Sequence, residues 1–345
     1  MLSMNTPSRS KTLGVGVIGL GVGEHHLKTY FENSHCKVIW ACDLSLDKLN
    51  QFSALYPDVQ FTTNADDVLS DTRVKLVSIA SFDNYHCEQI VRAIETGKHV
   101  FAEKPLCLTP TELVRIQEAL GTNPDVRLSA NMVLRACPRF KRVAKAIKLG
   151  EFGEIIFAEA DYLWGRREKL INGWRNEVSA YSIILGAAVH MVDLIVWMLG
   201  EKPIEVVAYG NNIATKGSSF KPDSFAVMLL QFQNGFVAKV TGNGVCVHPH
   251  FHGLKLYGTE KTVVHDLRGG MLINSPGDTL DNISELTGAY PAREFRAEIL
   301  ISFIDSIVGN RDQPIVTEQE IFDVMNICLS AQESSKGMGR QKIRY

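Results

Sequence analysis

The glycine-rich segment at residues 15–24, VGVIGLGVGE, is the feature that most constrains how this chain can fold. An apolar run leads into Gly19 and Gly21, and a helical pattern follows them. Gly19 permits a tight turn and Gly21 permits close approach of a ligand, so backbone N–H groups at the helix start can bind a pyrophosphate. Glu24 replaces the third glycine of the usual motif, and Gly23 comes one place earlier. We therefore expect a dinucleotide site formed by Gly19, Leu20, Gly21 and Val22.

Asp43 supports this interpretation and indicates which dinucleotide is bound. It ends the second expected strand, 22 residues after Gly21. A carboxylate at that position can accept hydrogen bonds from the ribose hydroxyls of adenosine, and it would repel a 2′-phosphate. No arginine follows in residues 44–46 to bind such a phosphate. The sequence therefore predicts NAD(H) rather than NADP(H).

Residues 14–132 alternate short apolar β-type runs with helical patterns, which is typical of a parallel sheet wound on both sides. The chain is thus expected to be α/β, with an N-terminal doubly wound Rossmann domain. We expect strands at 14–18, 37–42, 75–80, 99–102 and 126–130. We expect helices at 24–31, 46–55, 87–96 and 112–120.

The second half of the chain follows a different pattern. Pro138 begins an amphipathic helix that stops at Gly150, which indicates a hinge. Because 345 residues exceed the roughly 250 to 300 at which one core stops growing, we expect two domains, 1–134 and 135–345. The second is expected to be an α+β domain with a large, mostly antiparallel open sheet in meander order. Its expected strands are 155–164, 204–209, 225–232, 236–241, 253–257 and 262–266, and its expected terminal helices are 292–308 and 318–333.

Composition argues against several classes of protein. The formal net charge of -2 gives no general attraction to nucleic acid or to an anionic membrane. The seven cysteines contain no C-x-x-C pair, which fits reduced thiols and a cytoplasmic location. The apolar stretch 181–200 has His190 and Asp193 in its middle, which argues against a membrane span. Residues 1–11 lack the apolar stretch of a signal peptide and are expected to form a loose tail.

Two further motifs accompany the glycine turn: GKHVFAEKP at residues 97–105, and H-x-x-D-x-x-x-W-x-x-G at residues 190–200. Together they resemble the glucose-fructose oxidoreductase, inositol dehydrogenase and rhizopine catabolism (Gfo/Idh/MocA) family of NAD(P)-dependent oxidoreductases, over nearly the whole chain. The resemblance implies that Lys104 reaches the nicotinamide and the reacting hydroxyl, and that its bond to Pro105 is often cis. It also implies that His190 contacts the substrate or shares proton transfer, while Asp193 and Trp197 serve packing.

A lysine at the carboxyl end of a strand lies at the ligand-binding edge of a parallel sheet, which agrees with that role for Lys104. Other polar and aromatic residues follow the expected strands in the same way. Beyond the glycine turn and Asp43, we assign to the cofactor site Ser81, Phe82, His86, Glu103, Lys104 and Asn131.

Gly186 is a departure from the family pattern. The family usually has G-G-G-x-L-x-D-x-G-x-H, and residues 180–190 of this chain are AYSIILGAAVH, so Gly186 stands where the catalytic aspartate would be. Three interpretations remain open. Lys104 and His190 suffice as acid and base, which we favour; or another group such as Tyr181 or Tyr162 substitutes; or redox activity has been lost.

Aromatic and arginine side chains cluster between the first strand of the second domain and His190. Aromatic faces stack on sugar rings, and the arginine fork binds carboxylate or phosphate. Arg135 matches the family's arginine at the domain junction. The residues assigned to substrate binding are Arg135, Tyr162, Trp164, Arg166, Trp174, Arg175, Tyr181 and His190.

Three histidines, His248, His250 and His252, lie on one side of an extended segment with a spacing close to that of some zinc sites. The chemistry inferred from the other motifs needs no metal ion. We therefore expect an exposed or inter-subunit strand here, and no bound metal.

These features predict an NAD-dependent oxidoreductase that interconverts a secondary alcohol and a ketone on a sugar, sugar acid or nucleotide-linked sugar. One alternative is transient redox, in which NAD is reduced and reoxidised within one turnover to permit elimination or glycosidic cleavage. Another is an NAD-bound sensor that keeps the fold without the chemistry, which Gly186 motivates. We expect a homodimer or homotetramer that pairs through the open face of the C-terminal sheet, as is common in the family.

Overall fold

The computed structural model describes residues 12–178, 180–274, 276, 282–291 and 293–345. The expected tail at residues 1–11, and the first residue of the helix expected at 292–308, lie outside the described residues. The chain forms two compact units. Unit 1 comprises Met1–Glu103, Ile116–Asn131 and Ala297–Thr317, and unit 2 comprises Lys104–Arg115, Met132–Arg296 and Glu318–Tyr345.

Unit 1 is built on a six-stranded parallel sheet in the order β3-β2-β1-β4-β5-β6. β1 and β4 are buried on both faces, which is why their sequences are nearly all apolar. The strand order reverses between β1 and β4, where ligands of such sheets bind beyond the carboxyl ends. The strands are β1 (Leu13–Ile18), β2 (Cys36–Cys42), β3 (Gln60–Thr62), β4 (Leu76–Ile79), β5 (His99–Ala102) and β6 (Leu128–Ala130).

The helices of unit 1 surround this sheet. They are α1 (Gly23–Glu32), α2 (Leu46–Leu55), α3 (Ala65–Ser70), α4 (His86–Glu95) and α9 (Ala297–Val308), and α5 (Pro110–Thr122) contributes residues to both units. α9 and the segment after it pack on the sheet although they are far along the chain: the rings of Phe303 in α9 and Phe101 in β5 lie 5.9 Å apart, and the Ser129 hydroxyl donates to the Val316 carbonyl at 2.8 Å. The predicted Rossmann domain is confirmed, while β3 and α3 were not foreseen.

Unit 2 contains a nine-stranded sheet in the order β14-β13-β12-β11-β7-β10-β9-β8-β15. All neighbours are antiparallel except β7 and β10, which are parallel. The mostly antiparallel sheet is confirmed, but the meander order is wrong at its centre. β7, the first strand in sequence, lies between β10 and β11, because the segment joining those two strands crosses over it. The strands are β7 (Ile155–Leu163), β8 (Pro203–Asn211), β9 (Phe225–Phe232), β10 (Val237–Asn243), β11 (Phe251–Gly258), β12 (Thr262–Asp266), β13 (Gly269–Ile273), β14 (Ile283–Glu285) and β15 (Gln341–Lys342).

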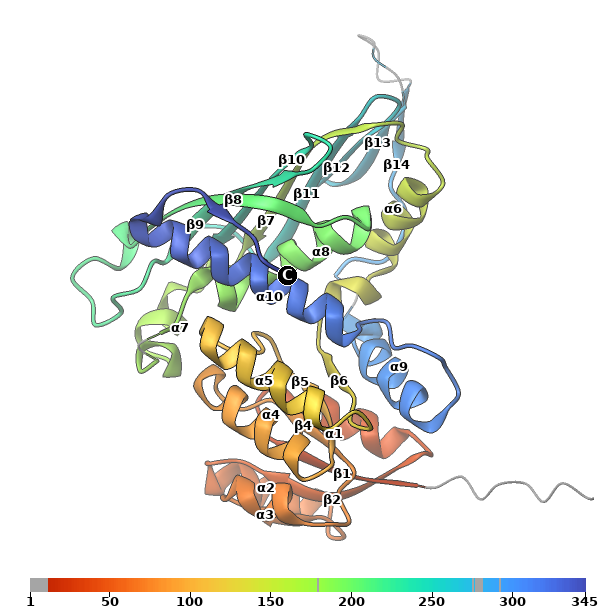
Figure 1. Cartoon of the computed structure of the whole chain (residues 1–345), viewed down its shortest axis with the longest axis vertical. Helices are drawn as coiled ribbons and strands as arrows, with labels where there is room; N and C mark the ends of the chain where they lie inside the picture. Colours follow the sequence, from red (N-terminus) through yellow and green to blue (C-terminus); the bar gives the residue numbers. More distant parts are fainter. Residues whose placement is uncertain (1–11, 179, 275, 277–281, 292) are drawn as a thin grey trace, which may run out of the picture. The chain divides into compact units, whose positions relative to one another are not determined.

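Helices α8 (Val189–Leu199) and α10 (Glu318–Glu333) run along one side of this sheet, as Figure 1 shows. α6 (Pro138–Lys148), α7 (Arg167–Ile171) and the π-helical turn η4 (Ile184–Ala188) complete the helical layer. α8 is apolar nearly all round, and all but two of its residues are buried. A helix with this pattern is expected to be enclosed by other parts of the protein. Within the described part of the chain, no helix is long and apolar enough to cross a membrane.

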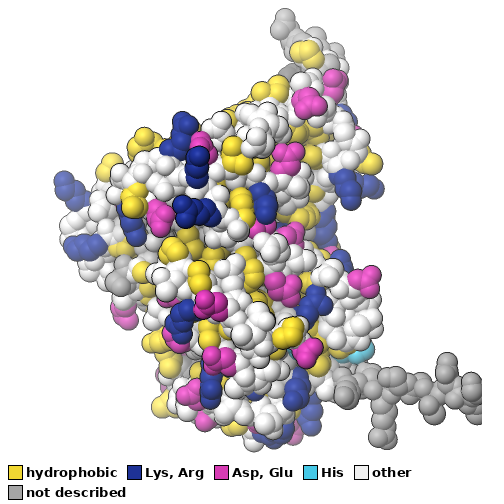
Figure 2. All heavy atoms as spheres, in the orientation of Figure 1, with side chains coloured by type: hydrophobic (Ala, Val, Ile, Leu, Met, Phe, Trp, Pro, Cys, Tyr) yellow, Lys and Arg dark blue, Asp and Glu magenta, His cyan; other side chains and the backbone are white. Residues whose placement is uncertain are grey.

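The other face of the sheet is open and carries charge. Lys239 on β10 lies opposite Glu159 on β7, with its Nζ 2.7 Å from that carboxylate and 3.2 Å from Asp161. Lys255 on β11 approaches Glu159 from the other side, at 3.5 Å. Cross-strand pairs of this kind stabilise the register of a sheet. Figure 2 has the orientation of Figure 1, with α8 and α10 in front of this sheet, and it shows charged side chains of both signs interspersed on that side, in agreement with the small net charge.

Candidate functional site

The turn after β1 has the geometry of a phosphate-binding loop. Gly19 has φ +89°, and a β-carbon there would lie 2.3 Å from the Ala80 carbonyl oxygen, so only glycine fits. A β-carbon on Gly21 would meet nothing within 4 Å, so the space above this residue is open. No side chain of the described residues caps α1 at Val22, which leaves N–H groups of its first turn for an anionic ligand. The loop therefore fits a dinucleotide pyrophosphate.

Asp43 is fixed beside that turn by backbone donors. Its carboxylate accepts the Leu20 N–H at 2.7 Å and the Ser45 N–H at 2.9 Å. Lys48, in the first turn of α2, brings its Nζ to 3.2 Å from the same carboxylate. Sequence reasoning did not include Lys48; its position in the first turn of the helix that follows Asp43 was the available signal. The placement of Asp43 fits a ligand that offers ribose hydroxyls.

Three predicted residues lie in or just after the loop that follows β4. The Ser81 hydroxyl donates to Gln89 Oε1 at 2.6 Å, and its carbonyl oxygen lies 3.2 Å from Nε2 of His86. His86 is fully buried, so its position suits contact with the loop backbone more than contact with a ligand. Phe82 is 39% exposed and presents its ring at the surface. Of the three, only Phe82 and Ser81 have side chains that are at least partly exposed.

Glu103 and Asn131 follow β5 and β6 and bond to each other. Asn131 Nδ2 donates to Glu103 Oε1 at 2.6 Å, and His26 Nε2 lies 3.3 Å from the same oxygen. His26 and Asn131 are buried, and within the described residues His26 Nδ1 and Asn131 Oδ1 have no partner. His26 is a residue that sequence reasoning missed, although its place in the first helix after the glycine turn was a signal. The trio leaves polar atoms at the ligand-binding edge of the sheet.

In unit 2, Lys104 points to the turn that precedes α8. Its Nζ donates to the Gly186 carbonyl oxygen at 3.0 Å, and its peptide bond to Pro105 is cis, as the family resemblance implies. Gly186 lies in the π-helical turn η4, at the position of the missing aspartate. The lysine ammonium is therefore held close to the first turn of α8, where His190 lies.

His190 is 6% exposed and packs face to face with Tyr162, with ring centroids 5.6 Å apart. Burial lowers its pKa well below the ordinary value, and the positive charges of Lys104 and Arg296 lower it further. The imidazole is thus neutral at pH 7. Its Nδ1 has no hydrogen-bond partner among the described residues, so it can bond a ligand.

His250 and His252 pack against Tyr162 as His190 does, and the four rings form one cluster. Sequence reasoning did not foresee this cluster. β11 pairs with β7 so that His252 lies directly opposite Tyr162, with their rings 5.0 Å apart, and His250 lies 5.1 Å from the same tyrosine. His252 accordingly is buried within the chain, where an exposed or inter-subunit strand was expected, and Tyr290 accepts its backbone N–H at 2.8 Å.

Burial lowers the pKa of His252 to about 3, with smaller contributions from His250, Arg296 and His265. Only His248 stays apart from the cluster, with its Nδ1 on the Pro249 carbonyl. Over the described ranges, no group of three or more His, Cys, Asp or Glu residues is arranged to hold a metal ion.

The predicted tryptophans and arginines form one stacked group. The Arg175 guanidinium lies 5.0 Å from the Trp164 ring and 4.4 Å from the Trp174 ring, and Arg166 lies 6.0 Å from Trp164. Tyr181 meets Trp174 edge-on at 6.4 Å. Such cation–π contacts leave the N–H edges of a guanidinium available for an anion. The structure thus brings five of the predicted substrate residues into one patch.

Arg135 does not join them. It is 1% exposed, and its guanidinium binds Asp193 and Glu320, each at 2.7 Å, with the Trp197 ring 6.0 Å away. Burial raises the pKa of Asp193, although the neighbouring guanidinium opposes that shift. A buried guanidinium bound to two carboxylates braces α8 and α10, so its placement favours packing over substrate binding.

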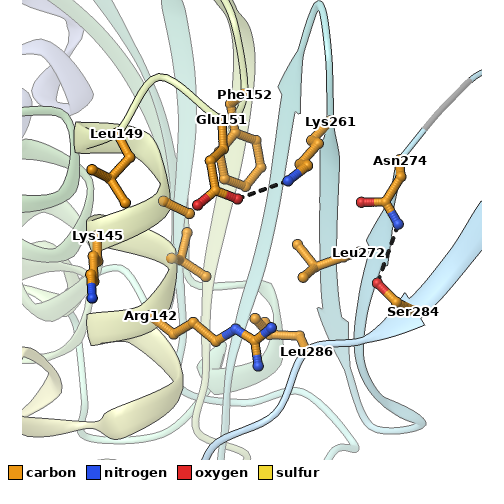
Figure 3. Close-up of a pocket in the computed structure, with 12 residues that line it drawn as sticks. Arg142, Lys145, Leu149, Glu151, Phe152, Lys261, Leu272, Asn274, Ser284 and Leu286 are labelled. Atoms are coloured by element: carbon orange, nitrogen blue, oxygen red, sulfur yellow. Dashed lines mark hydrogen bonds and ion pairs between the residues drawn. The ribbon is translucent and has the colours of Figure 1, made fainter.

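A hollow of about 390 Å³ lies elsewhere in unit 2, beside α6 and the outer strands β13 and β14. Figure 3 shows Lys261 paired with Glu151 in it, at 2.7 Å. None of the predicted site residues lines it. The hollow is therefore separate from the candidate site.

The fold and the loop after β1 define a class of protein, the dinucleotide-binding oxidoreductases with a Rossmann domain. Residues 13–131 match the model of an oxidoreductase family with an NAD-binding Rossmann fold, and residues 140–264 match the GFO/IDH/MocA C-terminal domain. Together these matches cover more than half of the chain. The chain belongs to the Gfo/Idh/MocA family and is an NAD-dependent oxidoreductase.

Individual relatives are distant. Inositol 2-dehydrogenase 2 from Saccharopolyspora erythraea is 23% identical, over 83% of this chain and 80% of its own. Among solved structures, myo-inositol 2-dehydrogenase from Lactobacillus plantarum has a TM-score of 0.83 at 20% identity, over 97% of this chain and 100% of its own. The WlbA dehydrogenase from Bordetella pertussis, in complex with NADH and UDP-GlcNAcA, has a TM-score of 0.81 at 19% identity, over 97% and 98%. These likenesses show the same fold.

Proposed function

We propose that this enzyme interconverts a secondary hydroxyl and a ketone on a sugar that carries an anionic group, such as a sugar acid or a nucleotide-linked sugar. The observation that carries the proposal is the placement of Lys104, which bonds the turn before α8 at 3.0 Å and lies close enough to depress the pKa of His190. A lysine beside a neutral imidazole is a suitable pair for moving the proton of an alcohol.

The residues of unit 1 are suited to hold the cofactor. The backbone from Gly19 to Val22 would bind the pyrophosphate, and Asp43 would accept hydrogen bonds from the adenosine ribose. Ser81 and Phe82 would line the same edge of the sheet. Bound NAD supplies the acceptor, or in reverse the donor, for the hydrogen and electron pair on the substrate carbon.

The proton of the reacting hydroxyl is handled by residues of unit 2. In the direction of oxidation the Lys104 amine takes this proton, and in reduction the ammonium returns it. His190, neutral at pH 7, can accept a hydrogen bond from the substrate or pass the proton onward through Nδ1. One well-placed acid-base group contributes about 10² to 10⁴ in rate.

Positive charge at the candidate site of unit 2 favours an anionic substrate over a neutral one. Arg166 and Arg175 are stacked on tryptophans, and among the described residues no carboxylate forms an ion pair with either guanidinium. Arg293 and Arg296 add positive charge near His250. Guanidinium groups of this kind bind carboxylate or phosphate, and the indole faces suit a sugar ring. UDP-GlcNAcA, the ligand of the WlbA dehydrogenase, has both features.

The assembly and compartment are part of the same proposal. We infer that two or four copies pair through the open face of the nine-stranded sheet, where Lys239, Glu159 and Lys255 form a cross-strand charge network. None of the seven cysteines forms a disulfide bond among the described residues, which suits the reducing cytoplasm. The two domains are proposed to divide at about residue 134.

The test is a panel assay of NADH formation with UDP-linked uronic acids, free uronic acids and the neutral cyclitol myo-inositol. We expect net NADH from at least one anionic member, and a fall in kcat of about 10² to 10⁴ in Lys104→Ala, with little change in NAD affinity. Lys216→Ala, which alters an exposed lysine of unit 2, is the matched control. Full activity of Lys104→Ala would contradict the proposal, and product without net NADH would favour transient redox.

A further inference from the structure

Gly186 leaves a space at the candidate site that another side chain fills. A β-carbon built on Gly186 would lie 2.4 Å from Oη of Tyr181 and 2.8 Å from its Cζ, closer than real contacts allow. The phenol of Tyr181 therefore occupies the space into which a side chain at position 186 would extend. The same glycine accepts the Lys104 hydrogen bond through its carbonyl oxygen.

Aromatic neighbours hold the Tyr181 ring in that place. The residue is 4% exposed, and its ring meets Trp174 edge-on at 6.4 Å and Phe220 at 5.8 Å. A ring packed in this way has little rotational freedom, so its hydroxyl stays beside Gly186. A phenol hydroxyl can both donate and accept a hydrogen bond, which suits an oxygen that changes from hydroxyl to carbonyl.

We propose that the Tyr181 hydroxyl takes the place of the carboxylate that the family pattern has at position 186, and donates a hydrogen bond to the reacting oxygen of the substrate beside Lys104. This inference rests on the proposed function and names the partner of Lys104. When the alcohol is oxidised, its O–H proton passes to Nζ of Lys104, and the hydrogen on carbon leaves with its electron pair to NAD. Negative charge builds up on the oxygen until the carbonyl forms. Tyr181 stabilises that charge and keeps its own proton throughout.

The charges around the site explain why a phenol suits it. Lys104 and Arg296 both act on His190 as positive neighbours, and Arg166 acts likewise on His250. A carboxylate at position 186 would offset these cations and repel a substrate carboxylate or phosphate. A neutral phenol supplies a hydrogen bond without that repulsion, which agrees with an anionic substrate.

Tyr181→Phe removes the hydroxyl and keeps the ring. On the most active member of the panel, we expect kcat to fall about 100-fold, with KM, NAD affinity and the thermal unfolding midpoint little changed. The deuterium isotope effect on the transferred hydrogen should rise, because the chemical step becomes slower relative to product release. Tyr209→Phe, the same change at a 71% exposed tyrosine on β8, is the matched control and should keep the parent kcat.

A reciprocal exchange tests the shared space. Gly186→Asp alone places a β-carbon against the Tyr181 hydroxyl, so we expect a lower unfolding midpoint and little activity. Tyr181→Ala combined with Gly186→Asp removes the obstacle and returns a carboxylate to the family position. The double variant should exceed either single variant in kcat by about tenfold, and it should prefer neutral over anionic members of the panel.

Full kcat in a folded Tyr181→Phe, together with an inactive Lys104→Ala, would overturn the role of Tyr181 and leave the proposed function intact. Full kcat in Lys104→Ala would overturn the proposed function itself. If Tyr181→Phe does not fold, the double variant decides, because no gain over the single variants contradicts the shared site.

Discussion

The two units of this chain build their sites in different ways. In unit 1 the site is mostly backbone: Gly19 has a conformation that only glycine adopts readily, Gly21 leaves open space, and Asp43 is fixed by N–H donors. In unit 2 the site is mostly side chain, with Lys104 bonded to the Gly186 carbonyl oxygen and His190 packed against Tyr162. A backbone site tolerates few residue types at each position, whereas a side-chain site can exchange one group for another.

Position 186 illustrates that difference. Where the family has an aspartate, this chain has a glycine, and Tyr181, five residues earlier, occupies the adjacent space. No comparable exchange is available at Gly19, because any β-carbon there meets the Ala80 backbone. We expect members of the family to vary in chemistry through unit 2 while keeping the loop after β1 unchanged.

In unit 2 the largest expected effect is a difference in stability between variants of two arginines, one that serves packing and one that we expect to bind substrate. Arg135→Ala should lower the free energy of unfolding by about 3 to 5 kcal/mol, because it leaves buried Asp193 without its partner. Arg175→Ala should cost less than about 1 kcal/mol of stability, because it removes cation–π contacts at a half-buried site. Urea unfolding of both variants measures the two changes.

The same two arginines should differ in the opposite sense in binding. Arg175→Ala is expected to raise KM for a UDP-linked uronic acid about tenfold, since a charge-assisted hydrogen bond is worth about 1.5 to 3 kcal/mol. A stable Arg135→Ala with a raised KM would mean that Arg135 binds substrate after all, and that the packing interpretation is wrong.

In unit 1 we expect smaller effects, on stability at Gly19 and on NAD affinity at Gly21. Gly19→Ala should cost about 1 to 3 kcal/mol of stability, because alanine at φ +89° is strained and its methyl meets Ala80. Gly21→Ala should leave stability nearly unchanged, because no atom of the described residues, apart from the two adjoining residues, lies within 4 Å of the added carbon. It should instead raise the Kd for NAD about tenfold, which is 1.4 kcal/mol. Calorimetric titration with NAD and thermal unfolding of both variants separate the two effects, and unaltered NAD binding by Gly21→Ala would place the pyrophosphate elsewhere.

The part of the structure that sequence predicted well is the part set by local pattern. The Rossmann sheet follows from alternating apolar runs and helical periodicity, and the loop at Gly19 follows from residues adjacent in the chain. The short strand β3 (Gln60–Thr62) gave no such signal, because three residues carry too little periodicity. The order of strands in unit 2 was also beyond local pattern, since the parallel pairing of β7 with β10 depends on a connection that crosses over β7.

The candidate site of unit 2 shows the same limit at the level of single residues. His252 and Tyr162 are 90 positions apart in sequence and become neighbours only through the register of β11 on β7. Arg135 and Arg175 are the same residue type and were both predicted to bind substrate, and only their burial and their partners distinguish them. Spacing along a chain cannot supply this information, because it arises from packing between elements that are distant in sequence.

The smallest expected effect concerns the histidines that unit 2 keeps neutral. The pKa of buried His252 is about 3 in the folded chain, against an ordinary value of 6.5 when unfolded. As pH falls below 6.5, the unfolded state therefore binds a proton that the folded state refuses, so stability is full above pH 6.5 and declines toward pH 3. At pH 5.5 the loss from this residue is about 1.4 kcal/mol. His252→Asn should lose that much less stability between pH 7.5 and 5.5 than the parent enzyme, as measured by urea unfolding at both values. His248→Asn, at a histidine outside the cluster, serves as control, and an equal acid loss in His252→Asn and the parent would show that His252 is not kept neutral by burial.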